Sequence, residues 1–108
     1  MAYDEGLAER IRDVIGTRGV VEKKMFGGLC FMVRGHMCCG VTGEELMLRV
    51  GPEQFDAALK RKHARKMDFT GRPMKGFVFV GSEGLESDDA LEEWIQFGRK
   101  FVKTLPKK

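Results

Sequence analysis

Three cysteines and one histidine are the residues in this 108-residue chain best suited to hold a soft metal or to act as a nucleophile: Cys30, Cys38, Cys39 and His36. Neighbouring residues of a β-strand point to opposite faces, so Cys38 and Cys39 are not expected to ligate one ion together. No Cys-x-x-Cys pair accompanies them. We therefore expect Cys30 and Cys39 to be reduced core residues, and we expect no bound metal or other cofactor.

Cys38 differs, because strand alternation directs its side chain outward, beside His36. An imidazole nearby would lower the thiol pKa, so a small thiol-reactive or soft-metal sensor is the alternative function, and Cys38 should react first with a thiol reagent. Catalysis would need a third, orienting group and a cleft. Asp68, the other acid/base candidate, has no second carboxylate nearby in the sequence. We expect the protein not to be an enzyme.

Charge is distributed in blocks along the chain, whose formal net charge is +3. Residues 60–75 and 99–108 together hold twelve basic residues and one acid, whereas 83–93 holds six acids and no base. Such blocks either attract an anionic partner or form solvated faces, with acids at a helix start and bases at its end. The candidate anion contacts are Lys60, Arg61, Lys62, Arg65, Lys66 and Arg72. Aromatic residues do not interleave with them, so any nucleic-acid contact is expected to be indirect.

Periodicity predicts the elements that must position these residues. Leu7, Ile11, Val14 and Ile15 share one helical face, Pro52 begins a short helix, and Ser87 is the expected N-cap of a long helix ending before Pro106. Strands are expected at 23–27, 29–34, 36–42 and 45–50, and again around 67–70 and 76–80, with 60–66 as a basic connector. The short connections require antiparallel pairing. This order predicts an α+β two-layer sandwich forming one domain over residues 1–108.

The alternation of side chains along each strand then predicts which face of the sheet each residue occupies. A two-residue turn at Arg34-Gly35 would pair Cys30 with Cys39 and Met32 with Met37, on the helix-covered face that also carries Leu46, Leu48 and Val50. The outer face would collect Leu29, Phe31, Val33, His36, Cys38, Met47 and Arg49. Its apolar members predict a surface for a protein partner or a homodimer, unless loops or the middle helix cover it. The docking residues expected there are Phe31, Val33, Cys38 and Met47.

Composition also narrows the cellular setting. No apolar run approaches the roughly 20 residues that span a bilayer, and the first residues have neither a basic segment nor an apolar core typical of a signal peptide. Three cysteines, an odd number, argue against a secreted disulfide framework. We expect a cytoplasmic protein without membrane contact.

Several short motifs together resemble one known family. They are Met-Phe-Gly-Gly at 25–28, Cys-Phe-Met-Val at 30–33, Gly-Val at 40–41, Leu-Arg-Val-Gly at 48–51, Met-Asp-Phe-Thr-Gly-Arg-Pro-Met-Lys-Gly-Phe at 67–77, and the helix around Trp94. With these motifs the chain is similar to the N-terminal domain of the TfoX family, here as a stand-alone domain. The resemblance implies a bacterial cytoplasmic protein with a secretion-chaperone-like α+β fold, but no catalytic residues.

The same resemblance implies a function in regulation. Full-length TfoX proteins regulate natural competence, act with a cyclic-AMP-responsive activator, and continue into a helical C-terminal domain. We therefore expect a non-enzymatic interaction module, linked to transcriptional or competence regulation through protein–protein contacts.

Overall fold

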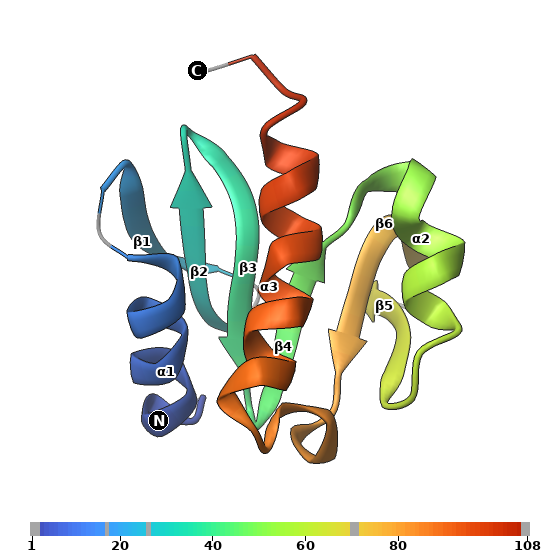
Figure 1. Ribbon diagram of the computed structural model, residues 1–108, viewed down its shortest axis with the longest axis horizontal. Coiled ribbons are helices and arrows are strands. Elements are labelled where there is room, and N and C mark those ends of the chain that lie inside the picture. The colour runs from blue at the N-terminus through green and yellow to red at the C-terminus, as the bar shows by residue number, and fades with distance from the viewer. Residues whose placement is uncertain (1–2, 17, 26, 70–71, 107–108) are drawn as a thin grey trace.

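A computed structural model describes residues 3–16, 18–25, 27–69 and 72–106, apart from the side chains of 68, 69 and 72–75. The elements in chain order are α1 (Glu5–Ile15), β1 (Val20–Met25), β2 (Gly28–Val33), β3 (His36–Thr42), β4 (Glu45–Arg49), α2 (Gly51–Leu59), β5 (Ala64–Phe69), β6 (Arg72–Val80), a short 3-10 helix η1 (Ser82–Leu85) and α3 (Asp88–Val102). The strands form one antiparallel sheet in the order β1-β2-β3-β4-β6-β5. The expected α+β fold is confirmed (Figure 1).

Side-chain caps and apolar stripes explain the helices. Asp4 caps α1 by accepting hydrogen bonds from the backbone N–H groups of Gly6 and Leu7, and Ser87 caps α3 by accepting one from Ala90 at 3.0 Å. The predicted face of α1 is buried against the sheet except at Val14, which is half-buried, and α3 buries Leu91, Trp94, Ile95 and Val102 there. In the described part of the chain, no helix is long and apolar enough to cross a membrane.

Tight turns explain the strand pairing. Arg34 and Gly35 both have positive φ, at 56° and 85°, as a two-residue hairpin requires, and Thr42 pairs with Glu45 across the next turn. The connector was predicted over 60–66 but ends before Ala64, because β5 begins there, opposite Val80. Pairing with the apolar strand β6 outweighs the poor strand propensity of charged residues, which can remain solvated on an edge strand.

The sheet carries a different apolar cluster on each face. The helix-side cluster combines strand residues with residues of all three α-helices, among them Ile11, Ala58 and Ile95. The second cluster contains strand residues only: Cys30, Met37, Met47, Met67 and Phe79 are buried, and Met25, Met32 and Phe77 pack against them half-buried. Leu46, Leu48 and Val50 lie in the helix-side cluster, as predicted.

A β-bulge in β3 overturns the face assignment predicted for β2. Met32 pairs with Met37 as expected, but Phe31 pairs with Cys39, so Cys38 is the extra residue. Side chains alternate between the two faces along a strand. One extra residue in β3 therefore reverses which residues of β2 lie on the same face as Leu46 and Leu48 of β4. Cys30, expected opposite Cys39 under the helices, instead pairs with Gly40 and faces the other way, as do Met32 and Met37.

Candidate functional site

The docking surface predicted on the open sheet face does not form. Phe31 and Cys38 are fully buried in the helix-side cluster, and Val33 packs half-buried against it, so these three predictions are wrong. Met47 does lie on the face without helices, but it is fully buried among its neighbours there. The bulge at Cys38 is the cause, since it turns Phe31 and Val33 toward the helices.

The predicted outward pair of Cys38 and His36 is also wrong. Cys38 is covered by α3, because a Cβ placed on Gly98 would lie 3.0 Å from the Cys38 Sγ. His36 is only 8% exposed, and its Nε2 lies 2.6 Å from the carbonyl oxygen of Pro106 in a hydrogen bond that ties β3 to the end of the chain. Both groups are therefore structural, and neither forms an accessible sensor site.

The adjacent thiols of Cys38 and Cys39 influence each other inside the core. The pKa of Cys38 is lowered by its side-chain hydrogen bond with Cys39 and, less, by the positive charge of Arg99. The same hydrogen bond raises the pKa of Cys39, and burial raises it further. All three cysteines are free and buried. Within the described residues, His, Cys, Asp and Glu side chains nowhere gather in a group of three that could hold a metal ion.

Two arginines of the basic connector are fixed by aromatic rings and acids. The Arg61 guanidinium lies 4.7 Å from the ring centre of Trp94 and 3.6 Å from Glu93. The Arg65 guanidinium lies 4.7 Å from the ring centre of Phe79 and forms a two-pronged ion pair with Glu45. These two predicted anion contacts already have partners within the protein.

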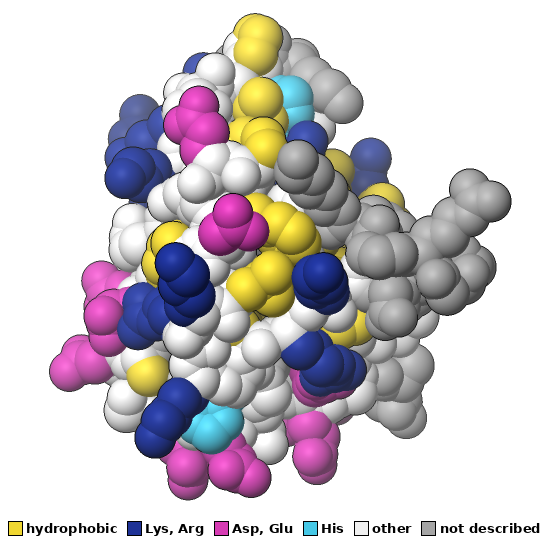
Figure 2. All heavy atoms as spheres, turned by 90° about the vertical axis from the view of Figure 1, so that its right-hand side faces the viewer, with side chains coloured by type: hydrophobic (Ala, Val, Ile, Leu, Met, Phe, Trp, Pro, Cys, Tyr) yellow, Lys and Arg dark blue, Asp and Glu magenta, His cyan; other side chains and the backbone are white. Residues whose placement is uncertain are grey.

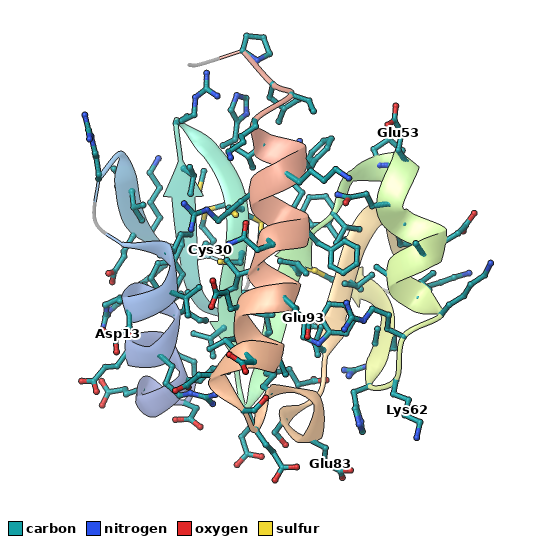
Figure 3. The ribbon with its side chains drawn as sticks, in the orientation of Figure 1. Asp13, Cys30, Glu53, Lys62, Glu83 and Glu93 are labelled. Carbon is teal, nitrogen blue, oxygen red and sulfur yellow. The ribbon has the colours of Figure 1, made fainter. Side chains whose placement is uncertain are left out.

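The lysines of the connector are free to meet a partner. Lys60, Lys62 and Lys66 are exposed, and Lys62 projects away from the body of the protein in Figure 3. Figure 2 shows this side of the molecule, where hydrophobic side chains gather at the centre with Lys and Arg on both sides. The predicted contact at Arg72 lies outside the described side chains. The connector thus offers exposed lysines, rather than arginines, to a partner.

A groove between α2 and α3 adjoins the connector. Two hollows of about 320 and 350 Å³ share Gln54 and Lys100. The groove is lined by Val50, Pro52, Glu53, Gln54, Arg61, Glu93, Gln96, Phe97, Lys100, Phe101 and Thr104. Each hollow has the size of a small-ligand pocket, and together they can accept several side chains of a peptide.

The base of this groove is held rigidly. The Gln54 side-chain amide of α2 donates one hydrogen bond to the carbonyl oxygen of Val50 and another to that of Phe97 in α3, each at 2.9 Å. Because one amide bridges both helices, the spacing between them is fixed before any partner arrives. A preformed groove lowers the entropic cost of binding.

Aromatic rings and cations alternate along the α3 side of the groove. Phe97 and Phe101 are half-buried, so part of each ring is open to solvent. Arg61 lies over Phe97 at 5.6 Å, and Arg49 lies over Phe101 at 5.1 Å. Lys100 is exposed between them and has no ion pair among the described residues. Acids also line the groove: Glu93 pairs with Arg61, and Glu53 lies on the opposite rim, as Figure 3 shows.

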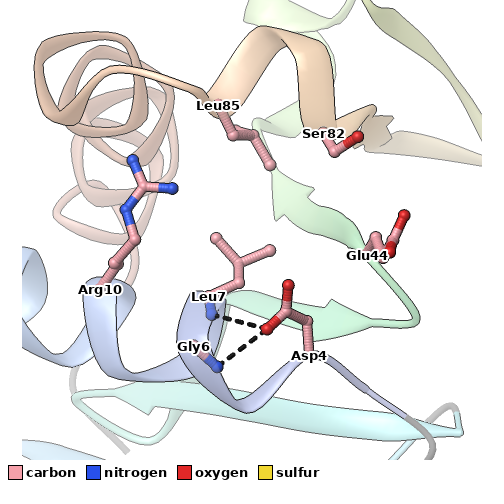
Figure 4. Close-up of a pocket in the computed structure, with 7 residues that line it drawn as sticks. All are labelled: Asp4, Gly6, Leu7, Arg10, Glu44, Ser82 and Leu85. Carbon is pink, nitrogen blue, oxygen red and sulfur yellow. Dashed lines mark hydrogen bonds between the residues drawn. The ribbon is translucent and has the colours of Figure 1, made fainter.

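A separate hollow, of about 290 Å³, lies between the start of α1 and η1 (Figure 4). Its polar groups serve the fold: Asp4 caps α1, and Arg10 donates a hydrogen bond to Asp88 at 3.3 Å. We therefore assign the candidate site to the groove between α2 and α3.

Sequence reasoning found the connector but missed this groove. The available signal was Phe97, four residues before Phe101 on the same helix and therefore next to it on the helix surface. Gln54, a polar residue among the apolar positions of α2, was a second signal.

Comparison with known proteins gives one match. The family model described as the TfoX N-terminal domain matches residues 14–101. Neither a curated protein nor a solved structure matches the chain at a significant level. The matched range contains all six strands, α2 and nearly all of α3, so it includes both walls of the groove.

Proposed function

The chain belongs to the TfoX N-terminal domain family, and on this premise we propose that it is a non-enzymatic interaction module that binds an acidic segment of a protein partner in the groove between α2 and α3. The observation that carries the proposal is the exposed Lys100 between two half-open phenylalanine rings, in a groove whose base is fixed by Gln54. Aromatic side chains are enriched in the buried centre of protein interfaces, whereas the rim is polar and solvent-accessible, the position that Lys100 would occupy.

The charges near the groove favour an acidic partner over a basic one. Lys60 and Lys62 extend the positive surface from Arg61, and Lys103 extends it beyond Lys100 at the end of α3. Positive charges around an apolar groove speed encounter with an acidic segment and orient it. The apolar side chains of that segment would then cover the exposed parts of Phe97 and Phe101.

The finer proposal concerns the process in which this contact acts. We infer a cytoplasmic role in transcriptional or competence regulation, exerted through the bound protein. Self-association is the second arrangement, with the groove of one copy occupied by the acidic residues 83–93 of another. Light scattering distinguishes the two, because self-association requires a concentration-dependent dimer that the groove substitutions below abolish.

The test compares three forms of the full chain in affinity capture from the native cytoplasm, followed by mass spectrometry. The groove variant combines Lys62→Glu with Lys100→Glu, and the matched control combines Lys23→Glu with Lys24→Glu on exposed positions of β1. We expect wild type and control to capture the same protein with or without nuclease, and the groove variant to lose it. Equal capture by all three forms, or capture that nuclease abolishes, would contradict the proposal.

A strain carrying the groove variant tests the regulatory role. It should reproduce the changes in transcript levels and natural transformation that follow deletion of the gene, while the control variant behaves as wild type. If the groove variant binds no partner but transcript levels and natural transformation stay as in wild type, the regulatory role is refuted. The proposal that the groove binds a protein would still stand.

A further inference from the structure

The described methionine side chains are segregated on one face of the sheet, together with one of the three cysteines, Cys30. Every methionine among the described side chains lies in the cluster that faces away from the helices, whereas the helix-side cluster contains no methionine. We call this group the sulfur face: Met25, Cys30, Met32, Met37, Met47 and Met67. Methionine is a common filler of irregular cores, but filling space does not explain why it is confined to one of two clusters.

The strand register brings three of these side chains together. Cys30 of β2 pairs with Gly40 of β3, and Gly40 pairs with Met47 of β4. Gly40 has no side chain, and the Met47 methyl group fills the space, lying 2.9 Å from where a Gly40 Cβ would be. Met47 therefore reaches across β3 toward Cys30.

Met25 approaches Cys30 from the opposite side. It pairs with Gly28, so it lies diagonally across from Cys30 on the same face, and the Cys30 Sγ is 4.0 Å from the Met25 carbonyl oxygen. Glycine thus stands opposite Met25, at Gly28, and opposite Cys30, at Gly40. Met25 is half-buried, and Met32, which flanks Cys30 along β2, is half-buried as well, so the group has a route to solvent.

From this juxtaposition we propose that Cys30, Met25 and Met47 form a binding site for one Cu(I) ion. Thiolate and thioether sulfurs are soft ligands that select Cu(I), and within the described residues Cys30 belongs to no group of three His, Cys, Asp or Glu side chains that could hold a harder or divalent ion. On binding, the Cys30 thiol releases its proton to solvent and the thiolate sulfur bonds to copper, whose oxidation state does not change. The ion and the thiolate together are neutral, as a buried site requires.

The test is an anaerobic titration of the folded chain with Cu(I) in competition with a colorimetric Cu(I) chelator. We expect one Cu(I) per chain, and X-ray absorption should show sulfur-only coordination. Met25→Leu, Met47→Leu and Cys30→Ala should each weaken binding by at least about tenfold. Leucine keeps the volume of methionine, so folding of the first two variants is preserved and can be verified by circular dichroism.

Two variants serve as controls with sulfur removed elsewhere. Met67→Leu removes a thioether from β5, at the far edge of the same face, and Cys38→Ala removes a thiol from the other face. Both should leave the affinity unchanged, as should the groove variant with Lys62→Glu and Lys100→Glu. The proposal is wrong if wild type cannot compete with the chelator, if Met67→Leu weakens binding as much as Met47→Leu, or if Cys38→Ala abolishes it.

Discussion

Gly98 of α3 lies directly against Cys38, the bulged residue of β3. A Cβ on Gly98 would be 2.9 Å from the Cys38 carbonyl oxygen and 3.0 Å from its Sγ, closer than side-chain carbons normally approach. The glycine lets α3 pack closely onto the sheet at the position of the bulge. This contact is why Cys38, although expected on the open face, is covered completely.

Replacing Gly98 with alanine should therefore destabilise the protein. Alanine favours a helix by about 1 kcal/mol over glycine, but overpacking a close contact costs about 1–3 kcal/mol, and the backbone oxygen cannot move aside easily. We expect a net loss of roughly 1 kcal/mol in the free energy of unfolding, measured by urea denaturation. Gln96→Ala, at an exposed position of the same helix, is the control and should change stability little. A more stable Gly98→Ala variant would contradict the close packing of α3 on β3.

The stacking of Arg61 on Trp94 can be followed optically, because Trp94 is the only tryptophan in the chain. Its ring is 3% exposed and lies 4.7 Å below the guanidinium. Arg61→Gln should uncover the ring, shift its fluorescence to the red, increase quenching by acrylamide, and cost about 1 kcal/mol of stability. Lys62→Gln, next in sequence but exposed, should leave the spectrum unchanged. Identical spectra for both variants would show that the arginine does not cover the ring.

Much of the fold was predictable because its signals are local. Asp4, Ser87 and the acids after it mark helix starts, and Arg34-Gly35 marks a hairpin through the backbone conformation that its turn demands. The bulge gave no such signal. The positions around it, Phe31 and Met32 on one strand and Cys38 and Cys39 on the other, are all apolar, so no polar residue reveals which face each one takes. One unrecognised residue then reversed the assignment of β2.

The candidate site was predictable only in part, for a related reason. A run of lysines and arginines is visible in any sequence, but whether each one is free depends on contacts made across the fold. Arg61 meets Glu93 and Trp94, and Arg65 meets Glu45, all of them at least 20 positions away. The groove likewise depends on the spacing between α2 and α3, which Gln54 sets through a hydrogen bond to Phe97.

The ion pair between Arg12 of α1 and Glu22 of β1 should give a pH-dependent contribution to stability. Both Glu22 oxygens accept hydrogen bonds from the guanidinium, at 2.7 and 2.8 Å, and this lowers the pKa of the Glu22 carboxyl. A carboxyl whose pKa is lower in the folded state stabilises the protein above its unfolded pKa and loses that effect as the pH falls. Glu22→Gln should cost about 0.5–1 kcal/mol at pH 7, since the pair is partly exposed, and much less near pH 3.

Urea denaturation at both pH values provides the measurement for this pair. Lys24→Gln, an exposed substitution on the same edge strand, is the control. The difference in the free energy of unfolding between wild type and Lys24→Gln should be about the same at pH 7 and at pH 3. If Glu22→Gln destabilises equally at pH 7 and pH 3, its effect comes from packing rather than from charge.

Cys30 should limit stability at alkaline pH. Burial raises the pKa of its thiol from about 9 to about 11. Between these values the unfolded chain releases the Cys30 proton while the folded chain keeps it, so deprotonation stabilises the unfolded state and the free energy of unfolding falls as the pH rises. Below pH 9 the thiol is protonated in both states and contributes no slope. Urea denaturation between pH 8 and 10.5 should therefore give a smaller decline for Cys30→Ala than for wild type.

The other titrating groups do not obscure this comparison, because they are the same in both proteins. Met32→Leu, a substitution without a titrating group on the same face of β2, should keep the wild-type decline. Equal slopes for wild type and Cys30→Ala would mean that water reaches the thiol in the folded state, and the sulfur face would then be open rather than buried at its centre.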